Sequence, residues 1–210
     1  MKNKELLIKA LQVQSKDYSN ELIKQFLLSN EKIETKFNLY HFQNDKDFSH
    51  TCMKGTTHMG GYLYATDGHI LAKVKSDYTV ELEGVILTKN GLIYRNEKLL
   101  NFDSVIPNLD DIKPLKIDFK KVLDIEKQYK IDKKTDNDKN KLYIIKINDC
   151  YFNIKLFSVI ARFSIAYQIE DIYLTGSTRP LVVQNKELDA TALIMPILIN
   201  DKYSAKIYEL

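Results

Sequence analysis

Apolar residues recur at helical spacing near the start of the chain. One set ends at Leu11 and a second set begins at Leu22. This spacing places apolar side chains along one face of a helix, so we predict two helices, or one bent helix, within residues 5–28. Ser19 and Asn20 are suited to cap a helix, which favours a break between residues 17 and 20.

From Phe37 onward the pattern changes to short stretches rich in tyrosine, threonine and β-branched residues, which is typical of strands. Residues 61–66 and 69–74 flank Asp67-Gly68, a two-residue turn that suits the twist of a hairpin. We therefore predict a β-hairpin over residues 61–74. Further strands are predicted over residues 79–87 and 91–94.

Helical spacing returns at Phe119, and Asp118 is suited to cap a helix that ends near Ile131. Residues 132–141 are all charged or polar, so an exposed loop is predicted there. Pro107-Asn108, followed by two aspartates, predicts a domain boundary at 108–113. The remaining predicted elements are a helix over 153–167 and strands over 142–147, 170–175, 180–184 and 190–199.

Composition agrees with a globular protein of one or two domains. The chain has 210 residues, of which 44% are hydrophobic and 28% are charged. The longest apolar stretch is interrupted by charges, and the first residues do not resemble a secretory signal, so we expect a cytoplasmic protein without a membrane span. Cys52 and Cys150 are far apart in the sequence and are expected to be reduced thiols.

The net charge of +3 permits a polyanionic partner without requiring one. The sequence has only three arginines, Arg95, Arg162 and Arg179, among its 31 cations. Because bidentate recognition of guanine relies on arginine, sequence-specific DNA recognition is disfavoured, whereas contact with phosphates stays open.

The predicted helices carry cationic stripes. These stripes suit a surface that contacts phosphates without reading bases, and ordinary solvated helix faces are the alternative explanation. The candidate DNA-binding residues are Lys9, Lys16, Lys120, Lys121, Lys127, Lys155 and Arg162.

Three other kinds of pattern bear on possible chemistry. His50, Cys52 and His58 could supply zinc ligands, but their spacing matches no finger or knuckle pattern, so we predict no metal site. Residues 55–57 and 175–178 are predicted turns, because neither has the sequence context of a phosphate-binding loop. No nucleophile and base occur in a recognisable arrangement, so no catalytic residue is predicted.

Three segments together resemble the bacterial DNA polymerase III beta subunit, the sliding clamp family. Residues 65–72 (ATDGHILA) resemble the family's ATDGHRLA hairpin. Residues 101–107 (NFDSVIP) resemble the end of its middle domain, and residues 191–197 (TALIMPI) resemble its last strand. The order of the segments is also the family's order, and the resemblance spans roughly residues 60–199.

The resemblance implies an α+β, DNA-clamp-like fold of two antiparallel-sheet domains with helices on one face. The expected domains are residues 1–108, truncated and with an extra N-terminal helix, and residues 112–199, followed by a tail over 200–210. It also implies a non-catalytic subunit that needs no cofactor and contacts duplex DNA through its helices. The implied pocket for polymerase or clamp-loader peptides consists of Thr66, Gly68, His69, Leu71, Val105, Met195, Pro196 and Ile197.

The chain also departs from the family. Family subunits have three domains and form dimers, so a ring of two-domain chains would need a trimer or another oligomer. Ile70 replaces the family's arginine after the histidine, and Ser104 stands where a cation is common. Residues 200–210 extend past the family's usual end, and they could lie in a groove of their own molecule.

The leading hypothesis is therefore a processivity or tethering factor in DNA replication or repair. A second hypothesis is an interaction module or regulator that keeps the peptide site but does not encircle DNA. A third is a metal-dependent enzyme that uses His50, Cys52 and His58.

Overall fold

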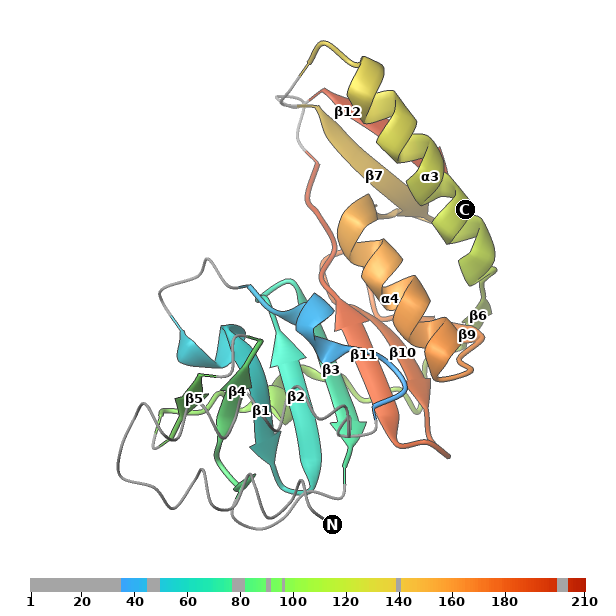
Figure 1. Cartoon of the computed structure of the whole chain (residues 1–210). Coiled ribbons are helices and arrows are strands. Elements are labelled where there is room, and N and C mark those ends of the chain that lie inside the picture. The colour runs from blue at the N-terminus through green and yellow to red at the C-terminus, as the bar shows by residue number, and fades with distance from the viewer. Residues whose placement is uncertain are drawn as a thin grey trace. The chain divides into compact units, whose positions relative to one another are not determined.

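The structure is a computed structural model that describes residues 35–44, 50–76, 82–89, 92–95, 97–138, 141–199 and 204–210 (Figure 1). The helices predicted within residues 5–28, with Lys9 and Lys16, lie outside these ranges. The described residues form two compact units. Unit 1 runs up to Asp67 and from Lys73 to Leu100, and unit 2 contains Gly68–Ala72 and Asn101–Leu210. The predicted division at 108–113 stays a prediction.

Unit 1 is an antiparallel sheet with the strand order β5-β4-β1-β2-β3, to which β3 contributes residues 73–75. The predicted hairpin is confirmed, because β2 and β3 flank a turn in which Gly68 has a φ of 90°. The elements are η1 (Leu39–Phe42), η2 (Thr51–Met53), β1 (Gly55–Met59), β2 (Tyr62–Thr66), β3 (Ile70–Lys75), β4 (Ile86–Thr88) and β5 (Ile93–Tyr94).

The predicted turn at residues 55–57 is wrong, because these residues begin strand β1. Thr56 and Thr57 are β-branched and buried, which suits a strand. Gly55 lies opposite Thr88 in the ladder with β4. A Cβ atom on Gly55 would lie 2.6 Å from the carbonyl oxygen of Leu87, so only glycine fits this crossing.

We expect Gly55→Ala to destabilise unit 1. The added methyl group collides with the Leu87 backbone and with the Ile86 side chain, and the backbone cannot turn aside, so β1 and β4 must separate. The expected loss is about 1–3 kcal/mol in the free energy of unfolding, typical of overpacking. Urea denaturation of the wild-type and variant chains measures it, and an unchanged midpoint would contradict the close packing of these strands.

Unit 2 contains two sheets and two helices. Residues 70–72 of β3 begin the strand order β3-β11-β10-β9-β6, and the smaller sheet has the order β12-β7-β8. The elements are β6 (Leu115–Lys116), α3 (Phe119–Thr135), β7 (Leu142–Ile147), β8 (Cys150–Asn153), α4 (Ile154–Ala166), β9 (Asp171–Leu174), β10 (Leu181–Asn185), β11 (Ala190–Ile194) and β12 (Ala205–Glu209), with the short helix η4 (Phe102–Val105) before them.

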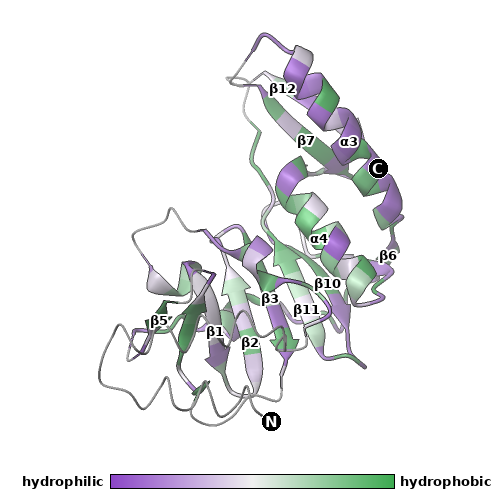
Figure 2. Ribbon diagram, in the orientation of Figure 1, coloured by the Kyte–Doolittle hydropathy of each residue, from purple (hydrophilic) through white to green (hydrophobic). Residues whose placement is uncertain are grey.

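The helices begin where side chains cap them. The Asp118 carboxylate accepts hydrogen bonds from the first backbone amides of α3, which confirms the predicted cap, and Asn153 does the same for α4. Phe157, Ile160 and Phe163 of α4 are fully buried, and α4 contacts strands of both sheets. Figure 2 shows the hydropathy of these elements: α3 is largely hydrophilic, whereas β11 is largely hydrophobic.

Two predicted boundaries in unit 2 differ from the structure. Helix α3 continues to Thr135, into the segment predicted as a loop. Lys133 and Lys134 suit its C-terminal end, Asp132 pairs with Lys206 of the C-terminal segment, and Asp136, just after the helix, pairs with Lys141. Strand β11 ends at Ile194 instead of continuing to residue 199. Strand β8 was not predicted.

The segment expected as a tail contributes a strand of unit 2. Strand β12 pairs in parallel with β7, from Ala205 beside Leu142 to Glu209 beside Lys146. Its main side-chain attachment is Asp132 of α3, which accepts hydrogen bonds from the Lys206 ammonium at 2.7 Å and from the Tyr208 hydroxyl. Residues 205–209 thus lie against their own chain as an edge strand instead of lying in a groove.

Acid is expected to release β12. Lys206, then Tyr208 and Gln128, lower the pKa of Asp132 from 3.8 to about 2 by hydrogen bonding to its carboxylate. Because the folded pKa is below the unfolded one, this stabilisation is present above pH 3.8 and is lost as the pH falls toward 2. Hydrogen exchange at the amides of β12 measures the release. Asp132→Asn should remove most of the pH dependence, and identical profiles would refute this role.

Candidate nucleic-acid and peptide interface

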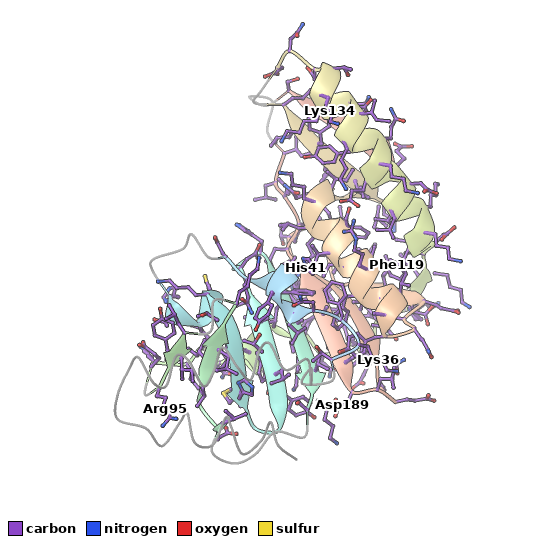
Figure 3. The ribbon with its side chains drawn as sticks, in the orientation of Figure 1. Lys36, His41, Arg95, Phe119, Lys134 and Asp189 are labelled. Carbon is purple, nitrogen blue, oxygen red and sulfur yellow. The ribbon has the colours of Figure 1, made fainter. Side chains whose placement is uncertain are left out.

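Helices α3 and α4 pack against each other and concentrate positive charge. Together they carry eight cationic and three acidic side chains, a net charge of +5. The whole chain has a net charge of only +3, so the remainder is slightly acidic. Figure 3 shows Phe119 at the start of α3 and Lys134 near its end, with side chains extending from the helix along its length.

The predicted phosphate contacts differ in how they are engaged. Lys120, Lys121 and Lys155 are exposed, and none of them forms an ion pair with another described residue. Lys127 is exposed but pairs with Asp124 at 2.6 Å, and the aspartate cancels its charge. Among the predicted cations within the described ranges, these three lysines are therefore the most available to a phosphate.

Arg162 has a structural partner that the sequence did not reveal. Its guanidinium donates to the carboxylate of Glu126 on α3 and, at 3.1 Å, to the carbonyl oxygen of Ser158. Glu126 also pairs with Lys130 at 3.1 Å and is largely buried. Arg162 thus links α4 to α3, and its side chain stays 40% exposed. Its predicted contact with DNA stays a prediction.

The segment after β11, residues 195–199, carries three of the predicted peptide contacts. The Met195 amide donates to the His69 carbonyl oxygen at 2.8 Å, and the Ile197 amide donates to the Tyr151 carbonyl oxygen at 2.7 Å. These two bonds fix the segment to the start of β3 and to β8, both in unit 2. The backbones of Met195 and His69, two of the predicted peptide contacts, are thereby brought together.

The predicted peptide-binding residues fall into an exposed group and a buried group. Met195 is 38% exposed, Val105 is 53% exposed, and Gly68 and His69 lie in the exposed turn. Pro196 and Ile197 are partly exposed. Thr66 and Leu71, in contrast, are buried, with exposures of 7% and 3%. Their side chains cannot contact a peptide in this conformation.

Leu198 was missed by the sequence analysis. It is 74% exposed and directly follows the three predicted contacts. The signal was present in the run Met195-Pro-Ile-Leu198, but the assignment of residues 190–199 to one strand hid it. With β11 ending at Ile194, Leu198 joins Met195 as an exposed apolar side chain of this segment.

The metal hypothesis receives no support. His58 is fully buried, its Nδ1 lies 3.0 Å from the Val85 carbonyl oxygen, and burial lowers its pKa to about 4. Cys52 is a buried free thiol. Within the described ranges, no three His, Cys, Asp or Glu side chains are grouped as metal binding requires. The helices described in both units are also too short or too polar to cross a lipid bilayer.

Comparison with known proteins identifies the fold. No protein-family model matches the chain, and no curated protein matches it in sequence. Among solved structures it is similar to the Bartonella birtlesii DnaN sliding clamp bound to griselimycin, with a TM-score of 0.52 and 15% identity over 78% of this chain and 64% of that one. It is also similar to the C. crescentus beta sliding clamp, with a TM-score of 0.55 and 13% identity over 77% of this chain and 62% of that one.

A third similar structure is the DNA polymerase III subunit beta of Pseudomonas aeruginosa, with a TM-score of 0.52 and 13% identity over 76% of this chain and 62% of that one. The chain thus spans less than two thirds of each of these clamps. The similarity supports the resemblance found in the sequence. The chain has an α+β, sliding-clamp-like fold.

Proposed function

We propose that the chain is a non-catalytic, clamp-like factor that holds duplex DNA without sequence preference and docks peptides of DNA polymerases or clamp loaders. The observation that carries this proposal is the charge of the packed α3–α4 pair, +5 within a chain of +3, on a sliding-clamp-like fold. Such a concentration on one pair of helices is what a phosphate-contacting surface needs.

The type of cation supports nonspecific holding. Seven of the eight cations on α3 and α4 are lysines, and the single arginine is paired with Glu126. Lysine contacts phosphate as a point charge and lacks the planar fork that recognises guanine. The surface is therefore suited to contacting the backbone of any duplex.

Peptide docking is supported by the segment that follows β11. Exposed Met195 and Leu198 offer apolar contact on a segment whose backbone is fixed at Met195 and Ile197. A fixed segment loses little conformational entropy on binding, which favours capture of a short apolar peptide. The structural neighbours include a sliding clamp bound to griselimycin.

Encirclement of DNA would need several copies. The chain spans 64% of the Bartonella clamp, and three two-domain chains have as many domains as two three-domain chains. We therefore propose a trimer as the ring-forming state. Light scattering over a concentration series, with and without duplex DNA, should give three times the mass of one chain. A monomer under every condition would exclude a ring.

The alternative is an interaction module or regulator that binds peptides without holding DNA. The exposed Met195 and Leu198 favour it, because they are independent of the cationic helices. Affinity for a fluorescent 30-base-pair duplex, measured by anisotropy over a range of salt concentrations, separates the two. Steep weakening with salt is expected for the clamp-like factor. Absence of binding at low salt would favour the module.

A further inference from the structure

Strand β12 lies at the surface of unit 2. It is an edge strand of the sheet β12-β7-β8, and all five of its residues are partly or fully exposed. Its partner β7 contributes Tyr143, Ile144 and Ile145 to the core. Strand β7 is therefore part of the core of unit 2, whereas β12 lies at its surface.

The attachments of β12 are mainly polar. The ladder with β7 is extended by hydrogen bonds from the Leu142 amide to the Ser204 carbonyl oxygen and from the Leu210 amide to the Lys146 carbonyl oxygen. Lys206 and Tyr208 bind the Asp132 carboxylate. Elements held by few buried apolar contacts open at a low free-energy cost, so β12 is expected to detach more readily than its neighbours.

We propose that the β7 edge accepts residues 204–210 from a second copy of the chain, so that exchange of β12 links copies. Two features carry this proposal. The strand that fits the β7 edge is β12 itself, because Lys206 and Tyr208 of any copy can bind the Asp132 carboxylate in the same way. The pairing is also parallel, so β7 and β12 are not joined by a tight turn, and a strand from another copy can adopt the same register.

Exchange of identical elements preserves every contact, because the swapped strand makes the same bonds to β7 and α3. The link goes beyond the proposed function, since it needs neither DNA nor peptide. It forms on the sheet β12-β7-β8 and uses neither the exposed lysines of α3 and α4 nor the segment 195–199.

The test places one cysteine in each of two full-length chains. Leu142→Cys in one and Ala205→Cys in the other are neighbours in the ladder only if β12 of the second chain lies on β7 of the first. Strands in a sheet lie about 5 Å apart, a separation that a disulfide spans. Cys52 and Cys150 are buried, which limits background reaction.

The chains are mixed, incubated and oxidised, and the covalent heterodimer is measured on a non-reducing gel. We expect at least about ten times the yield of a control mixture that pairs Ala205→Cys with Lys155→Cys, an exposed position outside the ladder. A second variant carries both Leu142→Cys and Ala205→Cys in one chain. An internal disulfide in this variant measures the fraction of chains whose β12 lies on their own β7.

Equal heterodimer yields in the two mixtures, with an internal disulfide in the double variant, would show that β12 stays on its own chain and would overturn the proposal. Failure of the double variant to form a disulfide, internal or between chains, would overturn it as well, because β12 would then not occupy β7. Neither result depends on DNA or peptide binding, so the proposed function is tested separately.

Discussion

Replacing Lys120, Lys121 and Lys155 together with glutamate is expected to lower the affinity for duplex DNA about 100-fold at low salt. The three side chains are exposed and form no ion pair among the described residues, so each is available to a phosphate. The slope of log affinity against log salt should fall by about three, because each lost lysine removes about one phosphate contact. Fluorescence anisotropy with one labelled duplex measures both quantities.

The matched control changes the net charge by the same amount elsewhere. Lys98, Lys113 and Lys186 are also exposed lysines, and all three lie outside α3 and α4. Their replacement with glutamate should reduce the affinity only slightly. If the two triple variants bind DNA equally well, the helix pair is not the contact surface, and the binding reflects overall charge.

Met195→Asp is expected to weaken peptide binding at least about 30-fold, the effect of losing one central apolar contact. Met195 is 38% exposed, so its replacement adds a charge to the candidate site without opening the core. Isothermal titration with a peptide from the clamp-binding segment of a bacterial DNA polymerase measures the loss. Leu71 is unsuitable for this test, because a charge at a 3% exposed position would unfold the strand.

Leu115→Asp is the control for Met195→Asp. Leu115 is 37% exposed and lies in β6 of the same unit, so the two changes are alike in exposure and in added charge. Peptide affinity should be unchanged in this variant. Equal weakening by both variants would mean that destabilisation is being measured, and normal binding by Met195→Asp would remove residues 195–198 from the peptide site.

Local chemistry made much of the fold predictable. Asp67-Gly68 between alternating strands specifies a tight hairpin, and Asp118 before an amphipathic stretch specifies a helix start. Strand β1 was missed because Gly55 resembles a turn residue, whereas its role depends on β4 passing within 2.6 Å. That proximity is a tertiary fact that the local pattern does not contain.

The candidate interface was predictable in part for the same reason. Lysines on a helix face are visible in the periodicity, but the pairing of Arg162 with Glu126 depends on the packing of α4 against α3. The burial of Leu71, which is 3% exposed, depends on tertiary packing that the local pattern does not contain. The docking of β12 could not be located, because its partners Asp132 and Leu142 are more than 60 residues away in sequence.

Retention on circular DNA tests the central claim most directly. The chain is mixed with a closed circular plasmid and with the same plasmid cut once, and each mixture is passed through a sizing column at moderate salt. A clamp-like holder should co-elute with the circle and be lost from the cut DNA, because a ring slides off a free end. Failure to co-elute with the circle, even at low salt, would contradict the proposal that this chain holds DNA.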